Sequence, residues 1–351
     1  MSSQGRVGFT VGVTADFRPA DGPGPTSWGD IGLGDLDDAG IAWRFLDDSD
    51  GRLLAEDVAG LDAVVVGSPT VDRAAVHGAE RLRLVARFGV GYDSVDVGAC
   101  TASGVAVTIT PDGARRPAAA ATLAMVLALQ HNLVVKDRLV RQGRWQDKTS
   151  WRGRGLTGAC VGVVGLGNIG SETVALMAPF DVEVLAHDPS RTAAEAAGLG
   201  VRLVPLAELL SRADVVVLTA ALTPQTHHII DAAALARMKP TALLVNIARG
   251  PLVDTGALVD ALSSGVIAGA GLDVFEVEPL PAGHPLTVMD NVVLSPHALS
   301  WTDEMALGNG RSAMAAVLAA AGWRAPTHLV DRSVLDHPRW VSGAAGGMLA
   351  P

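Results

Sequence analysis

Short apolar runs recur along the chain between longer, alanine-rich stretches. The runs are rich in valine, isoleucine and leucine, and several are apolar throughout rather than alternating with polar residues. Uninterrupted apolar strands are typical of parallel sheets that are buried on both faces. The runs are Val7–Val13, Ala63–Val66, Arg83–Arg87, Val105–Ile109, Cys160–Val164, Glu183–Ala186, Val215–Leu218, Ala242–Asn246, Ala268–Leu272 and Val292–Leu294.

The stretches between these runs are long enough for crossover helices, so the pattern predicts an α/β protein with parallel sheets. One series of runs lies before about residue 106 and the other between about 159 and 297, which predicts two Rossmann-like domains. Between them, Arg116–Gly143 has the period of one long helix, and residues 144–158 have the polar, turn-rich composition of a loop. Trp301–Ala321 is predicted to be helical, and the tail from Gly322 to be irregular.

Composition narrows the classes of protein. A chain of 351 residues can form two domains, and its net charge of −10 argues against nonspecific nucleic-acid binding. No run of about 18 apolar residues appears, which argues against a membrane span. The N-terminus lacks the features of a signal peptide, so we expect a cytoplasmic protein. The two cysteines, Cys100 and Cys160, are expected to be reduced thiols.

A glycine fingerprint follows the apolar run Cys160–Val164. Gly165 permits a tight turn, Gly167 lets the backbone approach a pyrophosphate, and Gly170 lets the next helix pack against the strand. The N-terminus of that helix would face the negative charge of the pyrophosphate. This arrangement predicts a dinucleotide site.

Asp188 ends the next strand-like run, where a carboxylate can accept hydrogen bonds from a ribose diol. It would repel a 2′-phosphate, so NAD is favoured over NADP. Arg191 lies three residues further on and could instead neutralise a phosphate.

Three consecutive predicted strands are each followed by a residue capable of chemistry: Arg249, Glu278 and His297. The carboxyl ends of parallel strands meet at the edge of the sheet where ligands bind in doubly wound folds. Reduction of a 2-keto acid needs a fixed cation for the substrate carboxylate, a proton donor for the carbonyl oxygen, and a carboxylate that keeps the donor protonated. The trio therefore predicts this chemistry.

At this point the chain resembles the D-isomer-specific 2-hydroxyacid dehydrogenases, over roughly residues 60 to 310. The segments that carry the resemblance are Arg87–Asp96, Gly162–Gly170, Leu222–Thr226, Met238–Pro240, Asn246–Gly250, Gly269–Pro279 and Ser295–Ala298.

The resemblance implies roles for particular residues. The backbone N–H groups of Val90 and Gly91 would hold the substrate carboxylate, Arg249 would be the catalytic arginine, and Glu278 would be the partner of the acid/base His297. The implied NAD contacts are Gly165, Gly167, Asn168, Ile169, Gly170, Asp188, Thr223, Ala248 and Asp273, with Asp273 on the side of the nicotinamide carboxamide. We expect no metal ion.

The resemblance also implies a domain organisation. The substrate domain would be discontinuous, formed by residues 1–105 and 301–351, and the NAD-binding domain would comprise residues 106–300, including the long helix. A homodimer through the NAD domains is expected.

Some residues depart from the family pattern and leave the substrate open. Arg115 and Arg116 are extra cations that could bind a second anionic group of the substrate, or could be a solvent-facing pair. Trp301 could form a wall of the substrate pocket or pack between domains, and Ser68 is a further candidate for that pocket. Thr219 stands where many relatives carry histidine.

The favoured function is an NAD-dependent oxidoreductase that interconverts a 2-keto acid and a D-2-hydroxy acid. One alternative is a dehydrogenase acting on a phosphonate or phosphite-type anion, because of Arg115 and Arg116. An alternative of another class is an NAD-sensing, corepressor-like binding protein, since such proteins share this scaffold and similar catalytic residues.

Overall fold

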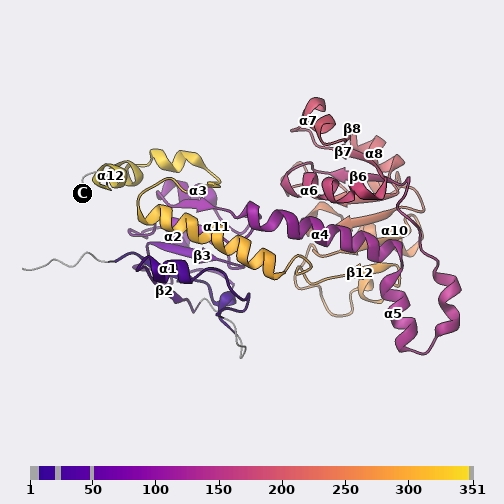
Figure 1. Ribbon diagram of the computed structural model, residues 1–351, viewed down its shortest axis with the longest axis horizontal. Coiled ribbons are helices and arrows are strands. Elements are labelled where there is room, and N and C mark those ends of the chain that lie inside the picture. Colours follow the sequence, from indigo (N-terminus) through magenta and orange to yellow (C-terminus); the bar gives the residue numbers. More distant parts are fainter. Residues whose placement is uncertain (1–7, 20–24, 48–50, 348–351) are drawn as a thin grey trace, which may run out of the picture. The chain divides into compact units, whose positions relative to one another are not determined.

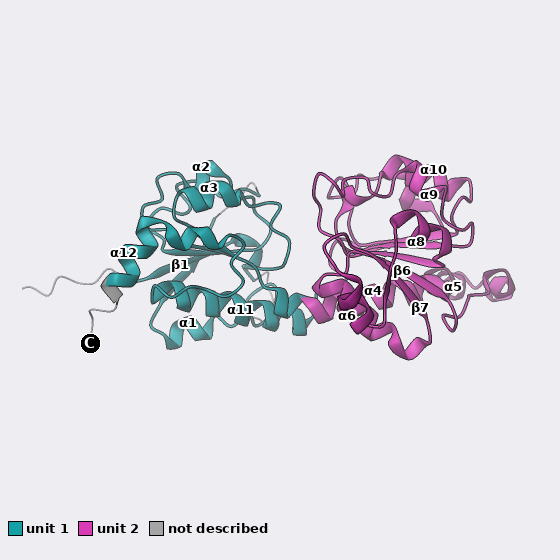
Figure 2. Ribbon diagram, turned by 90° about the horizontal axis from the view of Figure 1, so that it is seen from above, with its two compact units in different colours: residues 1–114, 301–351 teal, residues 115–300 magenta. Residues whose placement is uncertain are grey.

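The chain folds into two α/β units, each built around one parallel sheet. The computed structural model describes residues 8–19, 25–47 and 51–347. One unit comprises residues 1–114 and 301–351, and the other comprises residues 115–300 (Figure 2). They are called unit 1 and unit 2 below. The predicted run Val7–Val13 starts at a residue outside the described ranges.

Unit 1 has a five-stranded sheet with the order β2-β1-β3-β4-β5, and every neighbouring pair is parallel. This is the flavodoxin-like strand order, in which the chain adds a strand on one side of β1 and then continues, from β3, on the other side. The strands are β1 Thr10–Val13, β2 Ala42–Phe45, β3 Ala63–Val66, β4 Leu84–Arg87 and β5 Ala106–Thr108. The helices are η1 Ala15–Phe17, α1 Gly34–Asp38, α2 Arg73–Val76, α3 Val97–Ala102, α11 Asp303–Ala321, η6 Arg332–Asp336 and α12 Pro338–Gly347 (Figure 1).

Unit 2 has a seven-stranded parallel sheet with the order β12-β11-β10-β9-β6-β7-β8. Its central part has the strand order of dinucleotide-binding folds, in which the chain adds strands on one side of β6 and then continues, from β9, on the other side. The strands are β6 Cys160–Val164, β7 Glu183–His187, β8 Arg202–Leu203, β9 Val215–Leu218, β10 Leu243–Asn246, β11 Gly269–Leu272 and β12 Val292–Leu294. The helices are α5 Leu133–Arg141, η2 Trp145–Trp151, α6 Asn168–Met177, η3 Ala178–Phe180, α7 Ala193–Gly198, α8 Leu206–Arg212, α9 Ala232–Leu235, η4 Gly250–Leu252, α10 Thr255–Ser263 and η5 Pro285–Val288.

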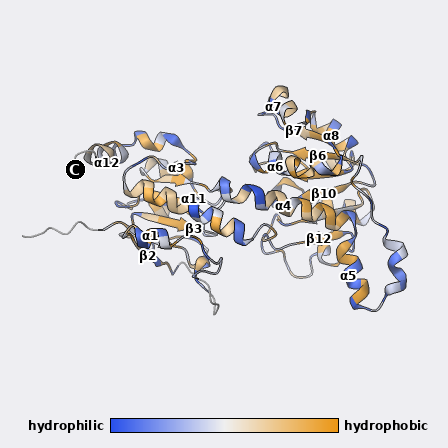
Figure 3. Ribbon diagram, in the orientation of Figure 1, coloured by the Kyte–Doolittle hydropathy of each residue, from blue (hydrophilic) through white to orange (hydrophobic). Residues whose placement is uncertain are grey.

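Each sheet is covered on both faces, which explains why its central strands are apolar throughout. Strands β3, β6 and β9 are buried along their whole length. In unit 2, successive residues of β9 belong to two different apolar cores, one on each side of the sheet: Val216 and Leu218 to one, Val215 and Val217 to the other. The strands accordingly stand out as apolar inside both units (Figure 3).

The long helix expected over Arg116–Gly143 is two helices. Helix α4 spans Pro111–Gln130 and α5 begins at Leu133, with Asn132 between them at a φ of 50°. Asparagine tolerates this left-handed conformation better than most residues, and the conformation ends the helical path. The start at Pro111 is earlier than expected because proline fits the first turn of a helix, whose N–H groups have no partner within the helix.

Two other expectations for irregular structure are wrong. The predicted loop 144–158 contains the 3-10 helix η2, and the predicted irregular tail contains η6 and α12. Helix α12 is held by Trp340, which is 3% exposed and donates a hydrogen bond from Nε1 to the carbonyl oxygen of Gly104 at 3.1 Å. The buried indole explains why the tail is ordered here.

One finding bears on membrane insertion. Among the described residues, no single helix has the length and apolar composition to cross a membrane. Helices α4 and α5 would pass together by length and composition alone, as a pair bent by 60°.

Candidate active site

Arg249 stands just past the carboxyl end of β10, on a turn held by Asn246. The Asn246 side chain is 1% exposed, accepts a hydrogen bond from the N–H of Ala248 at 3.1 Å and donates one to the carbonyl oxygen of Arg249 at 2.8 Å. The Arg249 guanidinium donates to the carbonyl oxygen of Ala248 at 2.7 Å and remains partly exposed. A buried asparagine thus fixes the backbone from which the arginine extends.

Glu278 and His297 form a hydrogen-bonded pair in unit 2. The Oε2 atom of Glu278 lies 2.8 Å from Nδ1 of His297, and Oε1 accepts the N–H of Phe275 at 2.9 Å. Within the described residues, Nε2 of His297 has no hydrogen-bond partner in the protein. The ring therefore has one nitrogen fixed by a carboxylate and the other available to a ligand.

The electrostatics of this pair favour an ionised Glu278. Partial burial raises the pKa of Glu278, but the hydrogen bonds from His297 and from the N–H of Phe275, with the positive charge of Arg249, outweigh it. The pKa of Glu278 consequently lies below its usual range. His297 and Arg249 thus both act on Glu278 within unit 2.

Asp273 holds the segment that follows His297. Its carboxylate is 4% exposed and accepts the N–H of Ala298 at 3.0 Å and of Leu299 at 3.1 Å. His297 itself has a φ of 54°, an uncommon value for a residue other than glycine. The sequence suggested Asp273 only as a cofactor contact, whereas in the structure it also fixes the backbone beside the histidine.

The glycine fingerprint has the local geometry that a dinucleotide needs. Gly165 has a φ of 95°, and a Cβ there would collide with Ala220. Gly170 packs against the carbonyl oxygen of Gly165, so a Cβ there would also collide. Gly167 is the N-cap of α6 and supplies no side chain to cap it, and a Cβ on Gly167 would meet nothing within 4 Å. The N–H groups of Asn168 and Ile169 belong to the first turn of this helix, and the open space beside Gly167 leaves room for a pyrophosphate next to the turn.

Asp188 lies at the carboxyl end of β7, beside this turn. Its Oδ2 atom accepts the N–H of Leu166 at 2.7 Å, and its Oδ1 atom accepts the N–H and the hydroxyl of Ser190. Partial burial raises the pKa of Asp188. These hydrogen bonds and the charge of Arg191 lower it by a larger amount, so the pKa lies below its usual range. Arg191 donates to the carbonyl oxygen of Leu166 at 3.0 Å and pairs with Glu195 at 3.5 Å.

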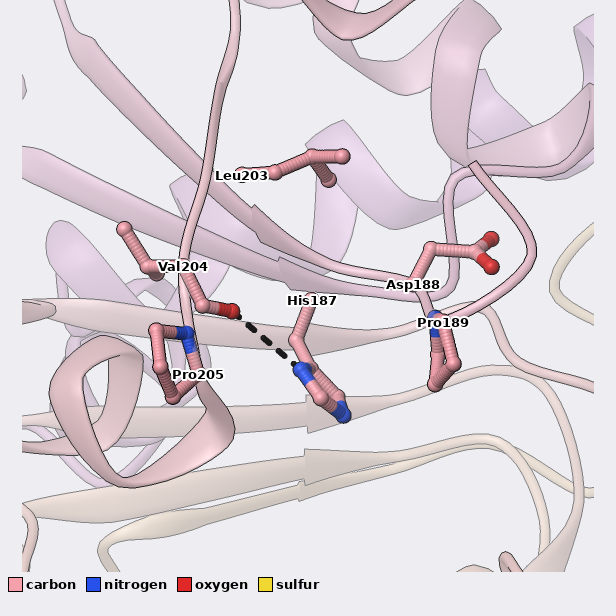
Figure 4. A pocket seen from close by; sticks show the side chains of 6 residues that line it. All are labelled: His187, Asp188, Pro189, Leu203, Val204 and Pro205. Carbon is pink, nitrogen blue, oxygen red and sulfur yellow. Dashed lines mark hydrogen bonds between the residues drawn. The ribbon is translucent and has the colours of Figure 1, made fainter. Parts of the chain in front are cut away.

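A pocket opens beside Asp188, with a volume of about 270 Å³. Figure 4 shows its lining, with the ring of His187 held by a contact of 3.2 Å between Nδ1 and the carbonyl oxygen of Val204. The lining residues are His187, Asp188, Pro189, Leu203, Val204 and Pro205. A mostly apolar pocket next to an ionised carboxylate fits an adenine ring attached to a ribose.

The other predicted cofactor contacts lie on turns of unit 2. Thr223 is exposed, and its N–H donates to the hydroxyl of Thr226 at 2.7 Å. Thr219, flagged as a departure from the family pattern, donates from its hydroxyl to the carbonyl oxygen of Gly165 at 2.6 Å. The threonine therefore supports the fingerprint turn, a role that its position in the sequence did not indicate.

The segment Arg87–Asp96, which resembles the family's substrate loop and contains Val90 and Gly91, lies in unit 1 and begins at the last residue of β4. Thr110 clamps it at Gly89: the N–H of Gly89 donates to the Thr110 hydroxyl at 2.7 Å, and the N–H of Thr110 donates to the carbonyl oxygen of Gly89 at 2.9 Å. In the described part of the chain, the N–H groups of Val90 and Gly91 have no protein acceptor. Ser68 is exposed, and its N–H donates to Asp16 at 2.7 Å.

Trp301 belongs to unit 1 and stacks on Trp28, with ring centroids 3.9 Å apart. Trp28 in turn contacts the ring of Phe88, within the predicted substrate loop, with ring centroids 5.2 Å apart. Trp301 remains 53% exposed. The indole is thus attached to the same aromatic cluster that supports the loop.

Arg115 and Arg116 both pair with Glu172 of α6. The distances are 3.4 Å from Arg115 Nε to Oε2 and 2.8 Å from Arg116 Nη1 to Oε1, and the Glu172 side chain is 18% exposed. The carboxylate of Glu172 therefore offsets one of the two positive charges, while the side chains of Arg115 and Arg116 remain 54% and 53% exposed.

Comparison with known proteins agrees with this geometry. Residues 123–298 match the model of the D-isomer specific 2-hydroxyacid dehydrogenase NAD binding domain. A glyoxylate reductase of Thermofilum pendens is 40% identical over 271 residues, covering 76% of this chain and 79% of that protein. A D-3-phosphoglycerate dehydrogenase of Mycobacterium leprae is 41% identical over 296 residues, covering 84% of this chain and 56% of that protein.

Solved structures give the same result for the whole fold. The TT0316 protein of Thermus thermophilus superposes with a TM-score of 0.80 at 32% identity, covering 92% of this chain and 100% of that one. The chain belongs to the D-isomer-specific 2-hydroxyacid dehydrogenase family. It is an NAD-dependent oxidoreductase that acts on 2-hydroxy acids and the corresponding 2-keto acids, as the sequence predicted.

Proposed function

We propose that this enzyme reduces glyoxylate and related small 2-keto acids to D-2-hydroxy acids, with His297 as the general acid. The observation that carries the proposal is the contact of 2.8 Å between His297 Nδ1 and Glu278 Oε2. Because the carboxylate fixes Nδ1, the protonated ring presents the proton on Nε2 to a ligand. Glyoxylate is the expected substrate because a relative at 40% identity over most of both chains is a glyoxylate reductase.

Each residue of the site would have a separate role in the reduction. Arg249, whose turn is fixed by Asn246, binds the substrate carboxylate, and the N–H groups of Val90 and Gly91 contribute further hydrogen bonds to it. When bound, NADH supplies the hydride that reduces the carbonyl carbon. His297 gives the proton of Nε2 to the carbonyl oxygen, and Glu278 stabilises the charged ring before that transfer.

The same proposal assigns the cofactor contacts and the domains. Gly165, Gly167, Asn168, Ile169, Gly170, Asp188, Thr223, Ala248 and Asp273 are assigned to NAD binding. Unit 2 would be the NAD-binding domain and unit 1 the discontinuous substrate domain, with the boundary inside α4 rather than before it. Support comes from the strand order of unit 2 and from the geometry at Gly167.

We further propose a homodimer formed through unit 2, in the cytoplasm. Helix α5 and the segment after it extend from the body of unit 2 (Figures 1 and 2) and carry exposed apolar side chains. These are Leu133, Val134, Val140 and Trp145, which are 59%, 40%, 58% and 60% exposed. Burial of such side chains against a second copy would be favourable. Light scattering of the purified protein tests the mass, and Trp145→Ser should weaken the dimer.

A substrate panel tests the central proposal. Initial rates with NADH would be measured for glyoxylate, hydroxypyruvate, oxaloacetate and phosphonopyruvate. Glyoxylate or hydroxypyruvate should give the highest kcat/KM. A preference for phosphonopyruvate would instead support a substrate with a second anion at Arg115 and Arg116. Turnover of no 2-keto acid, with tight binding in a peptide screen, would contradict the proposal in favour of a corepressor-like protein.

A further inference from the structure

The carboxylate of Glu276 joins two segments of unit 2 that lie far from it in sequence. Its Oε1 atom is 2.6 Å from Nε2 of His228, in the segment after β9. Its Oε2 atom accepts the N–H of Thr255 at 2.8 Å, at the first turn of α10. A carboxylate at a helix N-terminus is favoured by the helix dipole as well as by the hydrogen bond. Glu276 is therefore anchored at both oxygens.

The backbone around Glu276 lies against the Arg249 turn. Gly250 follows Arg249 and packs so closely on the peptide between Phe275 and Glu276 that a Cβ on Gly250 would collide with that peptide. The segment after β9 contacts the same turn, because the N–H of His228 donates to the carbonyl oxygen of Pro251 at 2.8 Å. His228, Glu276 and the Arg249 turn thus form one packed cluster within unit 2.

Phe275, which precedes Glu276, also holds the carboxylate of Glu278. The N–H of Phe275 donates to Oε1 of Glu278 at 2.9 Å, and Oε2 of Glu278 contacts His297. Phe275 therefore takes part in both contacts: its carbonyl group forms the surface against which Gly250 rests, and its N–H is the donor that orients Glu278. None of these groups is fixed by strand pairing, since all lie beyond the ends of β10 and β11.

We propose that Glu276 is a positioning residue for this reaction, which holds the 275–278 turn through His228 and Thr255 so that Glu278 and Arg249 keep their places around His297. The proposal rests on the proposed function of His297. Glu276 is not a catalytic residue here, because it acts only through its neighbours.

The charges around Glu276 suit an anchor. Partial burial raises the pKa of Glu276, but hydrogen bonds from Thr255 and His228 outweigh it, so the pKa lies below its usual range. The anion is then present across the working pH range. His228 is flanked on its other side by the ring of His227, stacked at 4.0 Å. Within unit 2, His297 and Arg249 are the charged groups that lower the pKa of Glu278.

The test compares Glu276→Ala and Glu276→Gln with the wild type in the reduction of glyoxylate. Glu276→Ala removes both anchors and should lower kcat by about 10- to 100-fold, the range expected for a small misplacement of reacting groups. Its loss of activity with falling pH should also move to higher pH, because a displaced Glu278 loses the hydrogen bonds that hold its pKa below the usual range. NADH affinity, followed by fluorescence, should be unchanged.

Glu276→Gln should rescue most of the activity, since an amide can accept from Thr255 and donate to His228. Glu183→Ala is the matched control: Glu183 is also a paired glutamate of unit 2, but it lies at the amino end of β7 and pairs with Arg212. The control should have wild-type kinetics and pH dependence. If Glu276→Ala does not fold, His228→Asn removes one anchor while keeping a residue that tolerates a φ of 50°.

The outcomes separate this inference from the proposed function. A folded Glu276→Ala enzyme with wild-type kcat and pH profile, alongside an inactive His297→Asn enzyme, overturns only the role of Glu276. An active His297→Asn enzyme overturns the proposed function itself. A fall in kcat without any shift of the pH profile, in Glu276→Ala and Glu276→Gln alike, would reduce Glu276 to a residue needed for stability.

Discussion

The imidazole of His297 and the carboxylate of Glu278 lie 2.8 Å apart, between Nδ1 and Oε2, although 19 residues separate them in the chain. The carboxylate is also bound to the N–H of Phe275, so the ring is oriented by a group that is itself held. Such an arrangement fixes which nitrogen of the ring faces a ligand.

Replacing His297 with Asn should remove the proton donor and leave the cofactor site intact. We expect kcat to fall by roughly 10²–10⁴, the usual contribution of a general acid or base. NADH binding, measured by fluorescence titration, should persist. Near-normal turnover of the best substrate would contradict the assignment of His297.

Replacing Glu278 with Gln should change the pH dependence of reduction more than its maximum rate. Because the pKa of Glu278 lies below its usual value of about 4.3, the carboxylate stays ionised as the pH falls, and the pair is lost only at still lower pH. Without the carboxylate, that acid-side loss should disappear from a profile of kcat/KM, with a smaller loss of kcat than in His297→Asn. An unchanged profile would mean that Glu278 does not act on the ring.

Replacing Asp188 with Ala should weaken NADH binding and strengthen NADPH binding. The wild-type carboxylate is held by the N–H groups of Leu166 and Ser190, and in the proposed role it would accept from a ribose diol and repel a 2′-phosphate. Dissociation constants for the two cofactors provide the measurement. A wild-type preference for NADPH of about tenfold, which is about 1.4 kcal/mol, would contradict this role of Asp188. Arg191 would then be the candidate for contact with the ribose.

Replacing Arg115 or Arg116 with Ala distinguishes a substrate contact from an ion pair. If either arginine binds a second anion, KM for oxaloacetate or phosphonopyruvate should rise by about 10- to 150-fold, as expected for one lost charge-assisted hydrogen bond. The KM for glyoxylate should not change. Because both arginines pair with Glu172, equal kinetics with every substrate would assign them to the surface of unit 2.

The buried strands could be predicted from the sequence because burial on both faces leaves an unmistakable apolar run. Cys160–Val164 and Val215–Leu218 occur in the structure with the predicted bounds. Strand β2 was missed because it lies at the sheet edge, where its residues alternate between exposed and half-buried and the apolar run disappears. The short edge strand β8 begins with an exposed arginine, Arg202, and was missed for the same reason.

The site was predicted in part. Positions at strand ends, such as Arg249, follow from topology, since parallel strands deliver their carboxyl ends to one edge. The pairing of Glu276 with His228 could not be predicted, because both lie on loops and sequence spacing does not fix where a loop turns. The break at Asn132 was also hidden, since one left-handed residue does not interrupt the apolar period around it. The catalytic and binding roles themselves remain predictions.

The division of unit 1 between the two ends of the chain has a consequence for how the protein is made. Its apolar core combines Val11 and Val13 of β1 with Met314 and Val317 of α11, which the ribosome adds only after all of unit 2. Unit 2, in contrast, is one uninterrupted segment. Since domains fold as their residues emerge, the half of the molecule that is translated first must complete its core last, after the cofactor half has already formed.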